Sequence, residues 1–409
     1  MTDPSPRHRA SGKPTVLVLA STYPRWAGDV EPGFVHELCK RLGARFNVIA
    51  LVPHAEGAQS GEIDGVEVIR YRYAPAKLET LVYGGGIAAN LRRSSWKHLL
   101  LPTFVGMQWL AVKRLLQTRR IDAIHAHWLI PQGWVASKAT RAVPYLVTSH
   151  GGDLFGLRGK FLESMKRDVA KGSAAMTVVS SAMAAEARRI GLAPPRLDIL
   201  PMGVDLRERF VPDATVPRAS DVLLAVGRLV PKKGFNFLLD AMPAIARARP
   251  NVRLDIAGFG PEEAALRAQA ERLGVANHVR FLGAMPQDKL PALYRSSSLL
   301  VAPFVRDDAG DQEGLPVVLM EAIGCGCPVV VGDVAGVDDL LGAMKAEVCV
   351  DPRNTEHLAN AVVAALDDPA ALSRRAEAIR SIAASRVDWE HIANAYGHLI
   401  AHCIDGVRA

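Results

Sequence analysis

EGLPVVLMEAIGCGCPVVV, residues 313–331, joins a short helical pattern to an unbroken apolar run. Pro316 lies near the start of the helical pattern, where its missing N–H costs nothing, and Gly324 lies where the pattern stops. The PVVV run is typical of a strand that is covered on both faces of a parallel sheet. The segment therefore predicts one helix–strand unit of an α/β fold.

Two glutamates stand eight positions apart in this apolar segment. We expect the helix to open at Leu315, which places Glu313 just before it and Glu321 two turns inside it. Glu321 is the only charge between Leu315 and Cys327, and a buried carboxylate is costly unless it is hydrogen-bonded. Each acid also has a purely structural explanation. Glu313 could complement the helix dipole, and Glu321 could be an ion-paired core acid.

The rest of the chain alternates strand and helix patterns in two series, which predicts parallel sheets with helices on both faces. The expected strands lie in TVLVLAS, NVIALVP, IDAIHAHW, VPYLVTSH and AMTVVSS, and then in DVLLAVGRL, VRLDIAGFG, VRFLG, LLVAPF and PVVVGD. A chain of 409 residues suits two domains. We expect a disordered tail (1–12), a first doubly wound domain (13–208), a linker (209–219), a second such domain (220–388), and a C-terminal helix (389–409) that packs back across the first domain.

Composition narrows the class of protein. A hydrophobic content of 49% and a charged content of 22% are typical of a soluble globular chain. The longest apolar stretch, 99–112, contains Pro102 and Gln108 and falls short of the roughly 18 residues that span a bilayer. Five scattered cysteines indicate a reducing compartment, and we expect Cys325 and Cys327 to be packing residues. The expected location is the cytoplasm, either free or peripheral on the inner face of the plasma membrane.

The net charge of +7 is unevenly placed. Residues 1–210 hold 29 Lys and Arg against 17 Asp and Glu, giving +12, whereas residues 211–409 hold 20 against 25, giving −5. A basic first half favours an anionic partner, such as a membrane surface or a phosphorylated acceptor. Since no nucleic-acid motif accompanies it, we expect no nucleic acid.

One segment of the basic half, 90–120, mixes aromatic, aliphatic and basic residues. It could lie on an anionic membrane, or it could be an ordinary core-facing helix with a solvated basic face. The residues that would meet the lipid are Arg92, Arg93, Lys97, Lys113, Arg114, Arg119, Arg120, Trp96 and Trp109.

Open parallel sheets bind ligands outside the carboxyl ends of their strands. The loop GRLVPKKG places Arg228 and Lys233 at such an end, before a helix. Two cations there suit a diphosphate, unless the loop is simply solvated. Gly258 and Gly260 follow another strand and would let a ligand approach the backbone.

Three histidines also lie at or near strand ends. His150 ends a strand in SHGGD, where it could donate a hydrogen bond into a cleft or be a satisfied rim residue. His125 and His127 share one strand face. Because no acidic cluster accompanies them, we expect packing or cleft lining rather than a metal site.

Taken together, GRLVPKKG, GFGP, VRFLG and EGLPVVLMEAIGCGCPVV resemble the retaining glycosyltransferases of the GT-B fold, group 1 or family 4 (GT4). In the first half, STYPRWAGDVEPGFVHELCKRL, IDAIHAHWLIPQG, SHGGD and LPMGVD fall in the family's order. The resemblance implies two Rossmann-like domains that face a cleft, with the nucleotide sugar mostly on the second.

The resemblance also implies roles for single residues. Arg228 and Lys233 match the diphosphate ligands, and Glu321 matches the ribose-binding glutamate. The catalytic candidates are Glu313, which matches the glutamate near the reacting carbon, and His150, which matches the histidine that approaches the sugar from the first domain. The other donor-binding candidates are Gly314, Leu315 and Val317 at the helix end, Arg280 and Phe281 in the stretch that reads the nucleotide base, Gly258 and Gly260 after a strand, and Gly28 and Gly33 in the first loop.

The sequence departs from the family pattern in two places. Many members have Phe-Gly where this chain has Leu315 and Pro316. The amides of Leu315 and Val317 can still serve a ligand there, but Pro316 cannot donate. In the first loop, RWAGDVEPGF separates Gly28 from Gly33, where many members carry a Gly-Gly pair. Which of the two approaches the donor phosphate stays open.

The implied activity is transfer of a sugar, with retained configuration, from a UDP-sugar or GDP-mannose to an acceptor hydroxyl. The expected acceptor is lipid-linked or a glycan in cell-surface polysaccharide assembly. The run RDDAGDQEG contains no D-x-D, so we expect no metal and no cofactor. We name no general base, and Glu313 as a covalent nucleophile is the weaker option.

Other functions stay open on the sequence alone. The alternatives are a sugar-nucleotide epimerase of the same fold and a non-catalytic nucleotide-sugar-binding protein. An oxidoreductase would need a stronger dinucleotide fingerprint than GFGP.

Overall fold

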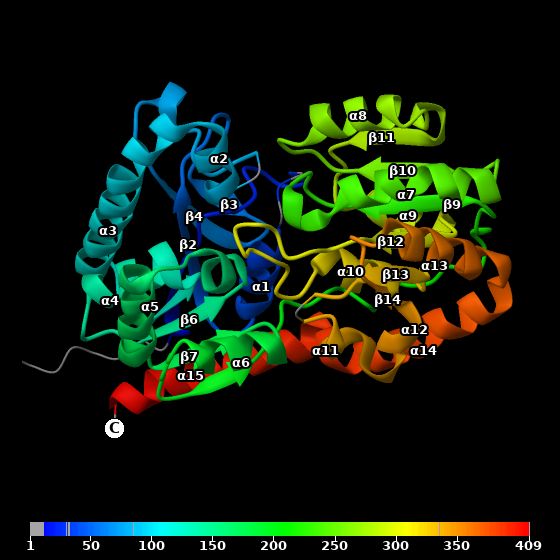
Figure 1. The fold of residues 1–409 in the computed structure, drawn as a ribbon. Coiled ribbons are helices and arrows are strands. Elements are labelled where there is room, and N and C mark those ends of the chain that lie inside the picture. The colour runs from blue at the N-terminus through cyan, green and yellow to red at the C-terminus, as the bar shows by residue number, and fades with distance from the viewer. Residues whose placement is uncertain (1–11, 30, 32, 85, 335, 409) are drawn as a thin grey trace, which may run out of the picture.

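A computed structural model describes residues 12–29, 31, 33–84, 86–334 and 336–408. Two α/β lobes lie side by side, and each is built on one largely parallel sheet with helices packed against it (Figure 1). This arrangement confirms the predicted fold class. The predicted tail lies outside the described residues except at its last position, and the predicted domain boundaries stay a prediction.

The sheet of the first lobe has the order β3-β4-β2-β1-β5-β6-β7-β8. Every neighbouring pair is parallel except β3 and β4, which are antiparallel. The strands are β1 (Thr15–Leu19), β2 (Asn47–Pro53), β3 (Gly61–Ile63), β4 (Val66–Tyr71), β5 (Ala123–His127), β6 (Tyr145–Ser149), β7 (Ala175–Val178) and β8 (Leu197–Ile199). The helices are α1 (Phe34–Leu42), α2 (Ile87–Arg93), α3 (Leu100–Thr118), α4 (Trp134–Ala139), α5 (Lys160–Gly172) and α6 (Ser181–Arg189).

The sheet of the second lobe is entirely parallel, with the order β11-β10-β9-β12-β13-β14. The strands are β9 (Val222–Val226), β10 (Arg253–Ala257), β11 (Val279–Gly283), β12 (Leu299–Ala302), β13 (Val329–Gly332) and β14 (Cys349–Val350). The helices are α7 (Phe235–Ala248), α8 (Glu263–Arg272), α9 (Leu290–Ser296), α10 (Val317–Gly324), α11 (Asp338–Leu341), α12 (Lys345–Val348), α13 (Thr355–Asp367) and α14 (Pro369–Val387). The central strands β9, β12 and β13 are almost wholly buried, as unbroken apolar runs predict.

Each predicted strand is present, but four strands were not predicted. β3 and β4 form a hairpin in which β4 alternates buried and half-buried residues, a pattern that VEVIRY does carry. β8 spans three residues and β14 two, too short to give a periodic signal.

The helix in the opening segment begins later than predicted. α10 starts at Val317, and Pro316 lies just before it with an extended ψ of 114°. The expected start at Leu315 is therefore wrong, because a residue that precedes proline is disfavoured in the helical conformation. Glu321 lies little more than one turn inside α10 rather than two. The predicted end of the helix at Gly324 is confirmed.

The apolar stretch in the first half forms a longer helix than predicted. A helical turn at Ser95–Leu99 leads directly into α3, and Pro102 falls in the first turn of α3, where proline is tolerated. By length and composition alone, the segment Ser95–Thr118 suffices to cross a membrane, and 28% of its apolar window is buried. The expectation that this stretch is too short is therefore wrong on those two criteria.

The chain returns to the first lobe through its last helix. α14 packs against α10 and α11 of the second lobe, and α15 (Trp389–Arg408) packs against α1, β5 and β6. Tyr396 and Ile400 of α15 are buried in one core cluster with Leu38 of α1. At the crossing point, the amide of Val204 donates to the carbonyl of Val387 at 2.7 Å. Figure 1 shows α15 running beneath the first sheet.

Candidate active site

The site lies where loops at the carboxyl ends of both sheets meet. On the second lobe these are the turn after β9 and the loop between β12 and α10, and on the first lobe it is the loop after β6. The approach is so close that a Cβ on Gly314 would lie 2.9 Å from the backbone oxygen of His150. A Cβ on Gly151 would in turn lie 3.0 Å from the amide nitrogen of Gly314. Glycine at both positions lets the two lobes touch beside the candidate catalytic residues.

Two lysines lie beside one carboxylate in the second lobe. Lys233 Nζ lies 3.5 Å from Glu313 Oε1 and 4.7 Å from the centroid of the Phe304 ring. Lys232 Nζ lies 3.4 Å from the same oxygen and 3.3 Å from Asp311. The structure therefore brings the predicted Lys233 to Glu313, and it adds Lys232 and Asp311, which sequence reasoning missed.

The electrostatics of this cluster fix the charge of Glu313. Burial raises the pKa of its carboxyl, but Lys232, Lys233 and Arg228 together outweigh burial and lower the pKa to about 2. Glu313 is therefore an anion at neutral pH. The cluster places cations where they could bind an anionic ligand, and the carboxylate of Glu313 lies beside them.

Glu321 occupies a different environment on α10. Its side chain is 2% exposed, and it accepts hydrogen bonds from Gln287 Nε2 at 3.1 Å and from the Tyr294 hydroxyl at 3.0 Å. These two hydrogen bonds offset part of the cost of burying the carboxylate. Burial raises its pKa to about 7, and the two hydrogen bonds oppose that rise. Glu321 can therefore change its protonation state near neutral pH.

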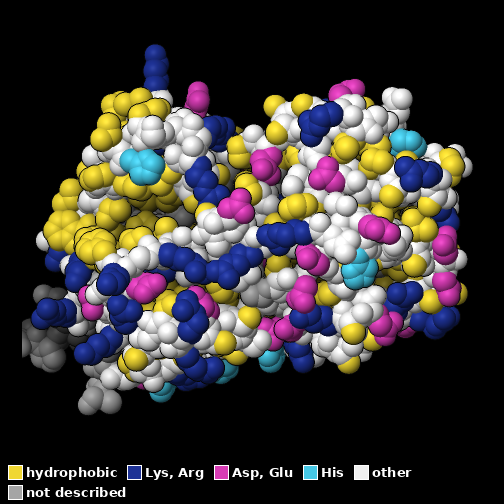
Figure 2. All heavy atoms as spheres, in the orientation of Figure 1, with side chains coloured by type: hydrophobic (Ala, Val, Ile, Leu, Met, Phe, Trp, Pro, Cys, Tyr) yellow, Lys and Arg dark blue, Asp and Glu magenta, His cyan; other side chains and the backbone are white. Residues whose placement is uncertain are grey.

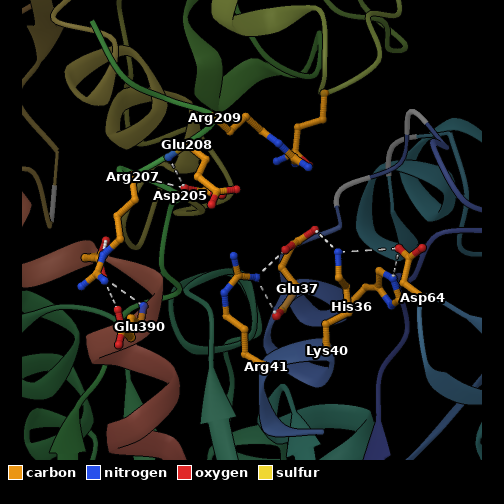
Figure 3. Close-up of polar contacts among 12 residues, drawn as sticks. His36, Glu37, Lys40, Arg41, Asp64, Asp205, Arg207, Glu208, Arg209 and Glu390 are labelled. Atoms are coloured by element: carbon orange, nitrogen blue, oxygen red, sulfur yellow. Dashed lines mark hydrogen bonds and ion pairs between the residues drawn. The ribbon is translucent and has the colours of Figure 1, made fainter. Parts of the chain in front are cut away.

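A small pocket between the lobes opens onto Glu321. Phe34 and Glu37 of α1 line it from the first lobe, and Gln287 and Val317 line it from the second. Arg209, on the segment that joins the lobes, also lines it and donates to Gln287 Oε1 at 3.3 Å. Figure 3 shows Arg209 opposite the ion-paired side chains of α1. The hydrogen-bond partner of Glu321 is therefore itself held by the joining segment.

His150 follows β6 and lies among aromatic rings. Its Nε2 lies 2.9 Å from His127 Nδ1, and its ring centroid lies 5.0 Å from that of Trp128 and 5.1 Å from that of Phe34. Burial, with a smaller contribution from the neighbouring His125, lowers the pKa of His150 to about 3, so the ring is neutral. Among the described residues, no three His, Cys, Asp or Glu side chains are grouped so that they could hold a metal ion.

The remaining residues predicted on the second lobe have partners within the protein. Arg280 on β11 pairs with Asp255 at 2.7 Å, and the guanidinium of Arg267 lies 4.3 Å from the Phe281 ring centroid. A Cβ on Gly258 would lie 1.8 Å from the Gly227 oxygen, and one on Gly260 would lie 2.4 Å from the Leu229 oxygen. Packing of the two loops against each other therefore requires both glycines, whatever ligand lies nearby.

The first loop leaves the choice between its glycines open. Gly28 has a φ of +79°, and a Cβ there would meet nothing within 4 Å, while Gly33 directly precedes α1. Glu31, a buried acid that sequence reasoning missed, accepts from the Gly84 amide at 3.1 Å. Burial raises its pKa, and the charge of Arg228 opposes that rise. The first loop thus brings an acid into the field of the second lobe's arginine.

Comparison with solved structures defines the class of fold. A sucrose-phosphate synthase from Thermosynechococcus elongatus superposes with a TM-score of 0.77 at 20% identity, over 96% of this chain and 100% of that one. Anabaena HepE in complex with UDP and glucose superposes with a TM-score of 0.71 at 17% identity, over 95% and 99%. The two lobes are therefore those of a GT-B glycosyltransferase fold.

Sequence comparison then assigns the family. The model for "Glycosyl transferase 4-like domain" matches residues 34–203, and that for "Glycosyl transferases group 1" matches residues 207–382. The chain belongs to the group 1 glycosyltransferases (GT4), enzymes that use nucleotide-sugar donors.

Two curated relatives come from Mycobacterium tuberculosis. A GDP-mannose-dependent alpha-(1-6)-phosphatidylinositol monomannoside mannosyltransferase is 28% identical over 86% of this chain and 89% of its own length. A glycogen synthase is 30% identical over 68% of this chain and 67% of its own length.

Proposed function

We propose that this glycosyltransferase moves a sugar, with retained anomeric configuration, from GDP-mannose or a UDP-sugar to a hydroxyl of a lipid-linked acceptor. The observation that carries the proposal is the cluster of Arg228, Lys232 and Lys233 around the ionised Glu313. Three cations, of which Lys233 is buried and the other two are partly buried, suit a diphosphate leaving group. A mannosyltransferase among the relatives supports GDP-mannose as one of the two donors.

In the proposed reaction, the bond between the anomeric carbon and the diphosphate oxygen breaks, and the acceptor oxygen bonds to that carbon on the same face. The acceptor's proton passes to the departing diphosphate. Arg228, Lys233 and the first amides of α10 stabilise the negative charge that gathers on the leaving group. Glu313 remains an anion beside the electron-poor carbon, and the cations take the place of a divalent metal.

Glu321 binds the ribose hydroxyls of the donor in this proposal. Its pocket residues Gln287 and Val317 lie on the second lobe, while Phe34 and Glu37 close it from the first. Both lobes therefore take part in ordering the donor. Their closure around it excludes water, which would otherwise hydrolyse the donor in competition with transfer. His150 approaches the sugar from the first lobe.

A thermal-shift screen over UDP, GDP, ADP and their sugars, with a chelator present throughout, tests the donor. We expect one nucleotide to stabilise the protein selectively, and Arg228→Ala to abolish that shift. A matched control is Arg249→Ala, since Arg249 pairs with Asp221 at 2.7 Å and has no part in the candidate site. Stabilisation by NAD(H) alone, or activity that requires added Mg²⁺ or Mn²⁺, contradicts the proposal.

The lipid-linked acceptor is supported by the outer face of α3 and the turn before it. Four large apolar side chains are exposed there: Trp96 (46%), Leu99 (78%), Met107 (40%) and Leu110 (51%). Figure 2 shows hydrophobic atoms gathered over this edge of the first lobe. Lys113 lies 5.7 Å from the Trp109 ring centroid on the same helix. An apolar stripe beside basic residues is the composition of an interfacial helix on anionic lipid.

Vesicle sedimentation tests this surface. We expect binding to vesicles that contain anionic lipid, weakened by salt, and a loss of binding in Leu99→Asp with Leu110→Asp. A control is Ile199→Asp, which places one such charge on an exposed apolar residue (46%) of the short edge strand β8. Equal binding by all three proteins contradicts the membrane role and leaves the donor chemistry untouched.

A further inference from the structure

A hydrogen-bonded pair of imidazoles links the first sheet to the candidate active site. His127 on β5 is fully buried, and His150 follows β6. Their ring planes are nearly parallel, with an interplanar angle of 12°, and His127 Nδ1 lies 2.9 Å from His150 Nε2. Burial is the main cause that lowers the pKa of each ring far below its usual value, so both are neutral. One proton must therefore form this bond, and either ring could supply it.

The other nitrogen of His127 decides which ring donates. His127 Nε2 is buried and has no hydrogen-bond partner in the described part of the chain. If His150 donated, His127 would carry its own proton on Nε2 and leave a buried N–H unpaired. Such orphan donors are rare, and an unsatisfied acceptor is the less costly defect. Donation from His127 Nδ1 leaves only a lone pair unsatisfied.

The neighbouring His125 follows the same rule, which can be checked independently. The Tyr396 hydroxyl donates to the carbonyl of Leu200 at 2.9 Å, so its oxygen is left to accept. It accepts from Thr177 at 3.3 Å, and Thr177 in turn accepts from Thr148 at 2.6 Å. Thr148 must then accept from His125 Nε2, 2.8 Å away. His125 thus carries its proton on Nε2, and its unpaired buried Nδ1 is again a lone pair.

We infer that His127 is a positioning residue whose Nδ1–H holds His150 as the tautomer with its proton on Nδ1. His150 is partly exposed, and its Nδ1 has no hydrogen-bond partner among the residues described. The consequence rests on the proposed function, in which His150 meets the donor sugar. The fixed tautomer offers a sugar oxygen a hydrogen-bond donor, whereas the other tautomer would offer a lone pair.

Nuclear magnetic resonance on the ligand-free protein tests the tautomer directly. With ¹⁵N-labelled histidine, two-bond ¹H–¹⁵N correlations report which ring nitrogen carries the proton, and His150→Asn assigns the signal. We expect the His150 proton on Nδ1 in the wild type. In His127→Leu, which removes the donor, we expect His150 to shift toward the Nε2–H tautomer. In His127→Asn, whose amide N–H falls near the position of Nδ1, we expect the wild-type state.

His125→Gln is the matched control, because it changes an equally buried imidazole of the same strand and keeps a donor toward Thr148. It should leave the His150 signal unchanged. A wild-type spectrum with the His150 proton on Nε2 overturns the inference, as does an unchanged His150 in His127→Leu. If the variants do not fold, the wild-type spectrum decides alone.

Transfer assays separate this inference from the proposed function. We expect His127→Leu to lower kcat about tenfold, the worth of one hydrogen bond, with the donor KM little changed and with recovery in His127→Asn. Should the spectra agree with the inference while His150→Ala transfers sugar at the wild-type rate, the positioning role stands and the assigned role of His150 fails.

Discussion

Replacing Glu321 with glutamine should change how the stability of the protein depends on pH. Burial raises the pKa of Glu321 to about 7, against a usual value of 4.5, despite hydrogen bonds from Gln287 and Tyr294. A carboxyl whose folded-state pKa is raised binds its proton more tightly in the folded protein. Its contribution is therefore most favourable below pH 4.5 and is lost as the pH rises from 4.5 to about 7.

The size of this effect follows from the two pKa values. One pKa unit is worth about 1.4 kcal/mol, so the interval between 4.5 and about 7 corresponds to roughly 3.5 kcal/mol. Because Glu321 is 2% exposed, solvent screening does not reduce this figure much. Glutamine cannot ionise, so Glu321→Gln should gain about 2.5 kcal/mol relative to the wild type between about pH 5 and about pH 8.

Urea unfolding of both proteins at several pH values, followed by tryptophan fluorescence, measures the difference. Glu313→Gln is the matched control. The Glu313 side chain is 14% exposed, and the lysines and Arg228 lower its pKa to about 2. It stays ionised across the same pH range, so the stability difference between Glu313→Gln and the wild type should be nearly constant there. A flat difference for Glu321→Gln as well would refute the assignment of a raised pKa to Glu321.

Other substitutions in the cation cluster have distinct expected outcomes. Arg228→Ala and Lys233→Ala should each lower kcat on the order of 10²–10³-fold at saturating donor, as loss of one leaving-group stabiliser does; a nucleotide-release assay measures it, and a full rate in both variants would remove them from the mechanism. Lys232→Met should raise the pKa of Glu313, because Lys232 lowers that pKa more than either other cation does, and should move the acidic limb of the kcat/KM profile to higher pH; an unmoved limb would show that Glu313 is not the group observed. Gly314→Ala would place a Cβ 2.9 Å from a backbone oxygen of the first lobe, so it should separate the lobes and enlarge the radius of gyration in X-ray scattering, with an unchanged radius arguing against a tight contact.

Much of the fold could be predicted because its signals are local. The buried parallel strands are continuous apolar runs, and the ends of such strands indicate where a ligand lies. β3, β8 and β14 were missed because each spans only two or three residues and is determined more by its pairing partner than by its own sequence, whereas the alternating pattern of β4 was present and was overlooked. The start of α10 was misplaced by two residues, since the effect of Pro316 on Leu315 was not weighed against the apolar pattern.

The candidate site was harder to predict than the fold, because its contacts join loops that are distant in the sequence. The spacing of Arg228 and Lys233 pointed to an anion, but nothing local distinguished Lys232 from a solvated neighbour. Only the structure places it against Asp311 and Glu313. A second lysine in the same turn, followed by an acidic loop further along the chain, is the signal that could have found it.

The same contacts explain how Lys232 and Lys233 can stay charged in the site when no ligand is bound. Unpaired lysines there would lose their charge or destabilise the fold, because desolvation of an isolated ammonium group is costly. Glu313 accepts both lysines, and Asp311 takes a further share of Lys232. The cations are therefore held in place before any diphosphate arrives. A diphosphate brings more negative charge than one carboxylate, so it can take over the lysines without moving them far. In the proposed reaction, stabilisation of the leaving group would therefore require little reorganisation, which is the condition under which fixed charges are most effective.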